Sequence, residues 1–437
     1  MSSVCTEQHR VGCALGGYYT ALAMEGVLPV LHCGPGCQEQ VQNVLALVNG
    51  GQNAHPFQEM FLPCTSFSES DVVFGGTDRL RKTVSMAIES YKAEMMLIVS
   101  GCTPAIVGDD VAEVAESFSD AKMPVRCAEL PGFTGNNLLG HSRVLRAVLG
   151  TCGRETPEVV PRMVNVFGIV PFYDPFWDGT LENFGYLLRA IGLKPNILYG
   201  RGNGYRNVKK VPRAEFNIVA SPWIDLDIAA ELRERFGTPL FHYPAIPVGP
   251  VESSRFLREL TAFSKLDSNH IEQYISDMEE RYYYYINRSL SWIHECRNMS
   301  KEFIVISGAS SALSFTRCLI NDLGLIPKKI YITEDVPSDY HKIIRGYFKD
   351  VAYDGPVEVI FTDDGGLAAS EMRDMDLSGR PIILGSAWDD ASAQNLGLPY
   401  IPISAPLGDY PIGSKNYFGY EGGLSLFCEY CAACDKA

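Results

Sequence analysis

The same sequence pattern occurs three times. In each case a continuous apolar run is followed by a glycine-bearing turn and then by an amphipathic helix. Met95–Val99 is followed by Ser100-Gly101-Cys102, and Phe303–Ile306 is followed by Ser307-Gly308. Other runs of this kind are Val125–Leu130, Met163–Gly168, Asn196–Tyr199, Phe216–Ala220, Lys329–Thr333, Val357–Thr362 and Pro381–Gly385. Strands that are apolar throughout are typical of sheets buried on both faces. This pattern predicts an α/β fold of mostly parallel sheets joined by right-handed crossovers.

The length of the chain predicts more than one domain. A chain of 437 residues is too long for one ordinary hydrophobic core. Breaks near residues 157–161 and 298–301 divide it into three Rossmann-like domains, over residues 1–158, 159–300 and 301–437, the last with a C-terminal helix. A long helix at about Asn269–Cys296 would connect the second domain to the third. The tyrosines of Tyr282–Tyr285 cannot share one helical face, so we expect several of them to contact a neighbouring domain or subunit.

Charge and hydropathy exclude two classes of partner. A net charge of −15 argues against a nucleic-acid surface, which needs a basic face. The longest apolar runs are far shorter than the roughly 20 residues that a membrane helix requires. The amino terminus has no apolar core of a signal peptide, so we expect a cytoplasmic protein.

Three of the thirteen cysteines occupy positions that would stabilise a thiolate. Cys13, Cys37 and Cys102 each lie at a turn that leads into a predicted helix, where free backbone N–H groups and the helix dipole lower the pKa of a thiol. Three thiolates in one domain suit a soft metal or an iron–sulfur cluster. The separations between them match no local ligand motif, and placement alone leaves buried structural cysteine as the alternative.

A series of sequence blocks resembles the nitrogenase component 1 family. The block Gly12–Cys37 is similar to the amino-terminal cluster region of that family. The blocks that follow in the family's order are Thr65–Glu69, Val73–Gly76, Ser100–Thr103, Ile106–Asp110, His242–Pro244, Ile246–Gly249, Gly397–Tyr400, Ala405–Asp409 and Gly419–Gly423. The last of these is similar to the beta-type chain rather than the alpha-type chain.

The resemblance implies a ligand set and a role. Cys13, Cys37 and Cys102 match the beta chain's share of the P-cluster, to which the alpha-type chain adds three more ligands. The cluster would lie between the two chains of an α2β2 complex and receive electrons from an ATP-dependent iron protein. It would pass them to a metallocluster in the alpha-type partner. The alpha-type ligand pattern for that metallocluster is not evident here, so the resemblance implies no catalytic residue in this chain.

Two departures from the family pattern bear on the cluster and the substrate. Gly132 stands where molybdenum nitrogenase beta chains carry a serine ligand, and the family's H-G-S-Q-G-C is replaced by the run His32–Cys37. We therefore expect either an 8Fe-7S P-cluster without oxygen ligation or a 4Fe-4S cluster. By elimination, we expect a nitrogenase-like reductase such as methylthio-alkane reductase, which cleaves carbon–sulfur bonds.

Several alternatives stay open at this point. They are a beta chain of an alternative nitrogenase, a cofactor-assembly scaffold and a cysteine-rich structural or zinc-binding chain. A dark-type protochlorophyllide reductase subunit ranks lower, because its carboxy-terminal extension has no match here.

Other cysteines and one histidine give weaker signals. Cys428, Cys431 and Cys434 form C-x-x-C-x-x-C but lack the fourth cysteine and the proline of a ferredoxin run, so we expect a terminal helix with packed cysteines. Cys33 and Cys64 are candidates for extra ligands, although packing beside the cluster is the simpler interpretation. For His32 we expect a core histidine with its hydrogen bonds satisfied.

Overall fold

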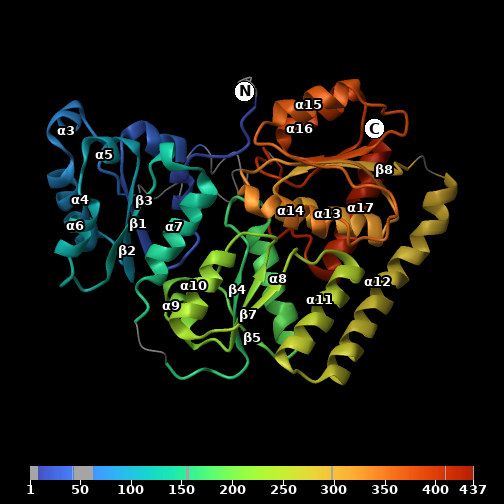
Figure 1. Ribbon diagram of the computed structural model, residues 1–437, viewed down its shortest axis with the longest axis horizontal. Helices are drawn as coiled ribbons and strands as arrows, with labels where there is room; N and C mark the ends of the chain where they lie inside the picture. Colours follow the sequence, from blue (N-terminus) through green and yellow to red (C-terminus); the bar gives the residue numbers. More distant parts are fainter. Residues whose placement is uncertain are drawn as a thin grey trace.

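The computed structural model describes residues 8–41, 43, 63–153, 157–296, 299–408 and 410–436. These residues contain three sheets, and every strand pair within them is parallel. The sheets succeed one another along the chain and occupy separate parts of the molecule (Figure 1). The predicted α/β fold with parallel sheets is confirmed. The division into domains at about residues 158 and 300 stays a prediction.

The first sheet shows why its strands are apolar throughout. It contains β1 (Val27–His32), β2 (Met95–Ser100) and β3 (Val125–Glu129), in the order β1-β2-β3. Along β2, Leu97 packs into the main core of the molecule, whereas Ile98 points to the opposite face and joins a second core. The helices around this sheet are η1 (Ala14–Gly17), α1 (Tyr18–Leu22), α3 (Glu69–Phe74), α4 (Thr77–Ser90), α5 (Cys102–Val107), α6 (Val111–Ser117), η2 (Gly132–Thr134) and α7 (Asn137–Leu149).

The second sheet has the order β5-β4-β6-β7. Its strands are β4 (Met163–Phe167), β5 (Lys194–Asn196), β6 (Phe216–Ala220) and β7 (Leu240–Tyr243). Its helices are α8 (Trp177–Ala190), α9 (Tyr205–Val208), η3 (Val211–Arg213), α10 (Leu226–Phe236) and α11 (Gly249–Ser264).

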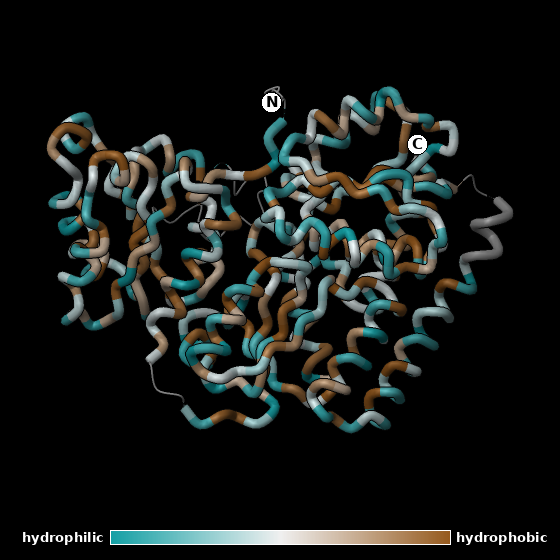
Figure 2. The backbone as a smooth tube through the Cα atoms, in the orientation of Figure 1, coloured by the Kyte–Doolittle hydropathy of each residue, from teal (hydrophilic) through white to brown (hydrophobic). Residues whose placement is uncertain are grey.

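The third sheet has the order β10-β9-β8-β11-β12. Its strands are β8 (Glu302–Ser307), β9 (Ile326–Ile332), β10 (Val359–Phe361), β11 (Ile382–Gly385) and β12 (Tyr400–Pro402). Its helices are α13 (Ala309–Asn321), α14 (Ser338–Tyr347), α15 (Gly365–Asp374), α16 (Ala387–Leu396) and α17 (Gly419–Lys436). Hydrophobic residues follow the strands through the interior of all three units (Figure 2).

The long helix α12 (Ser268–Cys296) follows the second sheet and leads toward the third (Figure 1), as the sequence predicts. Tyr282 is buried and packs in one hydrophobic cluster with Ile286 and with Phe427 of α17. The next three tyrosines are exposed, Tyr283, Tyr284 and Tyr285. One of the four thus packs against a helix of the third unit, and contact of the others with a subunit stays a prediction.

Two expected elements differ from the structure. The run Asn196–Tyr199 was expected to be a strand, but β5 ends at Asn196, and Leu198 is buried in the core without strand pairing. The sequence also predicts one helical run from Gly108 to Phe118. In the structure, helix α6 begins at Val111, because Gly108 adopts a left-handed conformation with φ of 81° and ends the separate helix α5. Buried positions require apolar residues in strands, helices and loops alike. An apolar run is therefore better evidence of burial than of a strand.

No helix in the part of the chain that the structure describes has the length and apolar character needed to cross a bilayer.

Candidate functional site

The candidate thiols gather at the carboxyl end of the first sheet. Cys33 directly follows β1, Cys102 begins α5 directly after β2, and Gly132 begins η2 shortly after β3. In a parallel sheet, the carboxyl ends of all strands lie at one edge, and ligand sites of open α/β sheets lie there. Cys37 lies in the first turns of a helix over residues 35–41, as expected.

Cys13 reaches this edge from the amino-terminal segment. It caps η1, and its Sγ accepts a hydrogen bond from Leu15 N at 3.5 Å. The segment is held against α7 by a backbone contact between Gly17 and Gly140, where a Cβ on Gly17 would lie 2.3 Å from the Gly140 oxygen. Cys13 also forms an isolated antiparallel bridge with Asn136. The two glycines therefore explain why η1 can approach α7 closely enough to bring Cys13 beside η2.

Gly132 lies between two of the thiols. Its backbone N donates a hydrogen bond to Cys102 Sγ at 3.0 Å. A Cβ at Gly132 would lie 2.7 Å from Cys13 Sγ and 3.5 Å from Cys102 Sγ. Gly132 thus lies directly between Cys13 and Cys102, and any side chain there would enter the space between their sulfur atoms.

Cys37 belongs to this group as well, because it lines the same cavity as Cys13. The thiol of Cys33 lowers the pKa of Cys37 to about 6. Burial raises the pKa of Cys13, and the nearby Cys102 and Cys37 add to this rise. Cys13 is exposed, and Cys37 and Cys102 are half-buried. The structure therefore brings together all three cysteines predicted from the sequence, at a place that is accessible from outside the chain.

Cys33 and Cys64 extend this group inward. Their Sγ atoms are 3.9 Å apart, and Cys33 is fully buried. Hydrogen bonding to Cys33 lowers the pKa of Cys64 to about 7. In the described residues, no three His, Cys, Asp or Glu side chains surround a single metal ion.

His32 is a satisfied core histidine, as expected. It is fully buried, with Nε2 3.1 Å from Asp109 Oδ2 and Nδ1 3.2 Å from Thr65 Oγ1. Burial lowers the pKa of this imidazole. Asp109 also accepts a hydrogen bond from Gly76 N at the start of α4. The histidine therefore fixes the loops around the thiols and does not itself point at them.

The three carboxy-terminal cysteines lie on α17, as expected. Cys428 is exposed, whereas Cys434 is buried with its Sγ 3.6 Å from Ser300 Oγ. Cys434 is therefore packed, as expected, whereas Cys428 is not.

An apolar surface patch adjoins the thiols, and the sequence analysis missed it. We define the apolar patch as Val72, Val73 and Phe74 of α3, Ile106 of α5 and Phe133 of η2, all exposed. Phe74 is 87% exposed, Ile106 73% and Phe133 65%. Helix α5 begins at Cys102 and η2 at Gly132, so both elements carry a patch residue close to the thiol group. Hydrophobic residues, coloured brown, are visible in the region of α3 and α5 in the first unit (Figure 2).

A large cavity opens on the thiol group. It has a volume of about 620 Å³, within the usual range for small-molecule sites. Cys13 and Cys37 line it, together with the aromatic side chains of Tyr19, Phe172 and Trp388. The lining comes from elements of all three units, so only the assembled fold creates this cavity.

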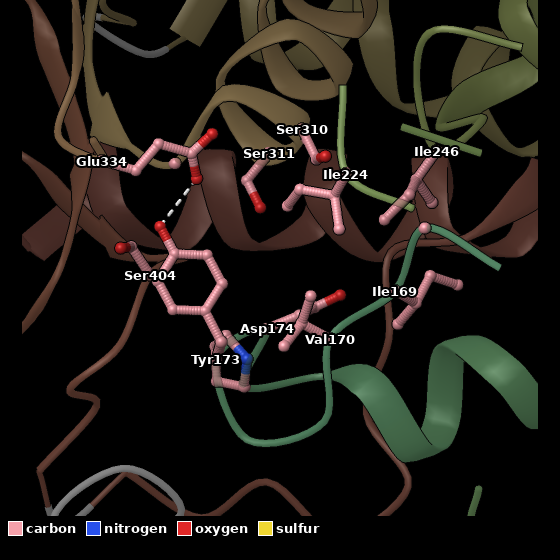
Figure 3. A pocket seen from close by; sticks show the side chains of 13 residues that line it. Ile169, Val170, Tyr173, Asp174, Ile224, Ile246, Ser310, Ser311, Glu334 and Ser404 are labelled. Carbon is pink, nitrogen blue, oxygen red and sulfur yellow. Dashed lines mark hydrogen bonds between the residues drawn. The ribbon is translucent and has the colours of Figure 1, made fainter. Parts of the chain in front are cut away.

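A second, much smaller cavity lies between the second and third sheets (Figure 3). Its volume of about 30 Å³ is room for a water molecule or two. Burial raises the pKa of Glu334, which accepts hydrogen bonds from Tyr173 OH and Trp223 Nε1, both at 2.7 Å. These hydrogen bonds join Tyr173 and Trp223 of the second unit to Glu334 of the third.

Comparison with known proteins gives one family. The family model described as nitrogenase component 1 type oxidoreductase matches residues 13–435. The B subunit of light-independent protochlorophyllide reductase from Stigeoclonium helveticum is 23% identical over 370 residues, which cover 80% of this chain and 68% of the relative. Its counterpart from Bradyrhizobium sp. (strain ORS 278) is 24% identical over 424 residues, covering 94% and 77%.

A solved structure of nitrogenase Cp1 at pH 6.5 has the same fold. The TM-score is 0.82 at 16% sequence identity, and the match covers 100% of this chain and 94% of that one. Protochlorophyllide reductase subunits ranked below methylthio-alkane reductase in the expectation from sequence, and the relatives above do not support that order.

Proposed function

Because this chain belongs to the nitrogenase component 1 type oxidoreductase family, we propose that it is the beta-type, electron-relaying subunit of a nitrogenase-like reductase. Cys13, Cys37 and Cys102 are its share of an iron–sulfur cluster that lies between it and a homologous alpha-type subunit. The two subunits form a cytoplasmic α2β2 complex, and an ATP-dependent iron protein supplies the electrons. The substrate is reduced in the alpha-type subunit.

One observation carries this proposal. Cys13 Sγ and Cys102 Sγ lie on the two sides of a side-chain-free residue, Gly132, with Cys37 beside them. The donor set is soft and rich in sulfur, and it lies at the accessible edge of the sheet, where a second chain can complete it. The residues present therefore fit an iron–sulfur cluster.

The chain's own groups hold and tune the thiolates. An iron–sulfur cluster, when bound, supplies reversible one-electron transfer. Gly132 N–H donates to Cys102 Sγ, and Leu15 N–H donates to Cys13 Sγ, so each sulfur has a backbone donor that stabilises negative charge. Cys37 and Cys102 lie in helices that begin just after β1 and β2, at the carboxyl end of the first sheet.

The apolar patch supports a docking site for the electron donor. Exposed apolar residues that cluster on a surface mark interaction sites. Ile106 and Phe133 lie on α5 and η2, which begin at Cys102 and Gly132, and Phe74 lies on α3, which contacts α5. A protein bound here would therefore approach the cluster. We place the iron protein on this patch.

Gly132 bears on the type of cluster. With no side chain at this position, Gly132 offers no oxygen ligand, so we propose an 8Fe-7S cluster of the P-cluster type held by cysteines alone, or a 4Fe-4S cluster. Iron and sulfide counts per complex, together with electron paramagnetic resonance, separate the two.

The Gly132→Ala variant is expected to lose cluster affinity. Its Cβ would lie 2.7 Å from Cys13 Sγ, closer than ordinary contact, and the thiol must move. Overpacking of this kind costs about 1–3 kcal/mol, or roughly 5- to 150-fold in binding. Competition with an iron chelator measures this loss. Unchanged retention of iron would show that the space beside Gly132 is not used by the cluster.

The substrate has two candidates. Elimination, based on the departures from the family pattern at Gly132 and His32–Cys37, leads to reduction of the carbon–sulfur bond of a methylthio-alkane. The relatives named as B subunits of light-independent protochlorophyllide reductase favour instead the reduction of protochlorophyllide. A cofactor-assembly scaffold and the beta chain of an alternative nitrogenase are the remaining alternatives.

The deciding experiment uses the complex purified without oxygen together with its alpha-type partner. We expect iron and sulfide in the complex and turnover of a methylthio-alkane with iron protein and ATP. Turnover of protochlorophyllide alone would select the second substrate, and production of ammonia from dinitrogen would select an alternative nitrogenase. Transfer of the cluster to an apo-enzyme without turnover would select the scaffold. A complex without iron would overturn the proposed function.

A further inference from the structure

We propose that Arg10 anchors the amino-terminal segment of residues 8–13 to the third unit and thereby holds Cys13 in place for the cluster. The inference rests on the proposed function, in which Cys13 is a cluster ligand. Arg10 does not touch the cluster in this scheme, so it is a positioning residue that acts through Cys13.

The side chain of Arg10 occupies a buried site on the third unit. Its Nη1 donates hydrogen bonds to Ser386 Oγ at 2.6 Å and to Asp389 Oδ2 at 2.9 Å, and its Nη2 donates to Asp389 Oδ1 at 2.7 Å. The side chains of Arg10 and Asp389 are only 4% and 2% exposed. A bidentate pair fixes the direction of the guanidinium as well as its position. Because both charges are buried, leaving either one unpaired is strongly unfavourable, and the segment stays docked.

The acceptors of Arg10 are themselves fixed by the fold. Ser386 is the N-cap residue of α16, and its backbone N donates to Asp389 Oδ2 at 2.7 Å as part of a capping box. Trp388 lies in the same first turn of the helix, and the Cζ of Arg10 is 5.1 Å from the centroid of its ring. Arg10 therefore binds to the rigid beginning of a helix rather than to mobile side chains.

Backbone contacts dock the start of the segment on the same unit. Arg10 N donates to Asp363 O, and Gly365 N donates to Gln8 O, both at 2.8 Å. Gln8 N donates to Asp364 Oδ1 at 2.8 Å. These partners lie between β10 and α15, so residues 8–10 pair with the loop that joins these two elements.

The other end of the segment is attached to the first unit. Gly12 N donates to the side-chain oxygen of Asn137 at 2.9 Å, and Asn137 N donates to Gly12 O at 3.0 Å. Cys13 pairs with Asn136 next to them. Cys13 follows Arg10 by three residues, which span at most about 11 Å, so the chain between the two attachments has little slack. Loss of the Arg10 anchor therefore frees one end of the segment that carries the ligand.

The exposure of Cys13 makes this anchor important. Cys13 is exposed, so the hydrophobic core does not hold its side chain. Residues that orient a metal ligand without binding the metal typically change metal affinity by roughly 10- to 100-fold. We expect an effect of this size from Arg10, although it lies in a different unit from the sheet that carries the thiols.

The first test replaces Arg10 in the purified complex with the alpha-type partner. Arg10→Met should bind iron roughly 10- to 100-fold more weakly than the wild type in competition with a chelator. The cluster that remains should show altered g values in electron paramagnetic resonance, because the geometry at Cys13 changes. Arg10→Lys keeps the positive charge but not the bidentate contact, and it should restore part of both signals.

A second variant removes the same contact without removing a charge. A Cβ at Gly365 would overlap Arg10 Nε, so in Gly365→Ala the arginine must leave its site. We expect the same weakening of iron binding and the same change in g values. Gly346→Ala is the matched control, because Gly346 lies in α14 of the same unit and an added Cβ there has no atom within 4 Å. It should behave like the wild type.

Unchanged iron affinity and g values in Arg10→Met or in Gly365→Ala would overturn the inference. An equal loss of iron in Gly346→Ala would overturn it as well, because a general weakening of the third unit would then explain the effect. If Arg10→Met did not assemble with its partner, Gly365→Ala would decide by the same criteria. These results leave the proposed function standing, whereas a wild-type complex without iron would overturn both.

Discussion

Replacing Cys37 with alanine should remove the iron–sulfur cluster from the purified complex and leave the fold of the chain intact. Cys37 is half-buried, and its replacement leaves no large cavity in the core. A cluster shared between two chains loses one of the few ligands that this chain supplies, and the loss of a metal ligand is among the most damaging substitutions known. We expect most of the iron and sulfide to be lost, together with the paramagnetic signal of the reduced state.

The measurement is the iron and sulfide content of each variant, with circular dichroism as the check on folding. Cys13→Ala and Cys102→Ala should behave like Cys37→Ala. Cys428→Ala is the matched control, because this exposed cysteine lies on α17, outside the unit that carries the thiol group, and its loss should change nothing. Full cluster content in Cys37→Ala, with a normal signal, would refute the assignment of this residue as a ligand.

The second large effect is expected at the apolar patch. Phe74→Asp should block electron transfer from the iron protein while the cluster stays in place. Phe74 is 87% exposed, so its replacement costs the fold little. Truncating an aromatic residue at the centre of an interface costs about 2–4 kcal/mol, or roughly 30- to 1000-fold in kcat/KM for the iron protein. The buried charge of the new aspartate adds to this loss.

A chemical reductant tests whether the defect of Phe74→Asp lies in docking of the iron protein, because it reduces the cluster without docking. Dithionite should reduce the cluster of Phe74→Asp as it does in the wild type, whereas iron protein with ATP should not. Met86→Asp serves as the control, because Met86 is an exposed apolar residue of α4 outside the apolar patch. If Phe74→Asp accepted electrons from the iron protein at the wild-type rate, the docking site would have to lie elsewhere.

Much of the fold could be predicted from the sequence. The strand Phe216–Ala220 was predicted with its observed bounds, and the expected helix Asn269–Cys296 differs from α12 by one residue. These elements carry strong local signals, namely continuous apolar runs and long amphipathic periods. β1 was not predicted, since Pro29 and His32 interrupt its apolar run, although all six of its residues are buried.

The apolar patch shows where local signals fail. The run Val72-Val73-Phe74 is as hydrophobic as a core strand, yet all three residues are exposed. Whether an apolar residue lies inside depends on which other elements cover it, and nothing within the described part of the chain covers α3 on this side. The block Val73–Gly76 was noticed only as part of the family resemblance.

The sequence by itself determined that Cys13, Cys37 and Cys102 lie at turns leading into helices, because strand, turn and helix signals are local. Only the tertiary structure decided that these turns meet. It placed Gly132 between Cys13 and Cys102, residues far apart along the chain, and it set Cys33 against Cys64. The physical reason is that parallel strands bring their carboxyl ends to one edge of a sheet, while the close contact of Gly17 with Gly140 brings in the amino-terminal segment. Distances between such residues follow from packing, which no short stretch of sequence encodes.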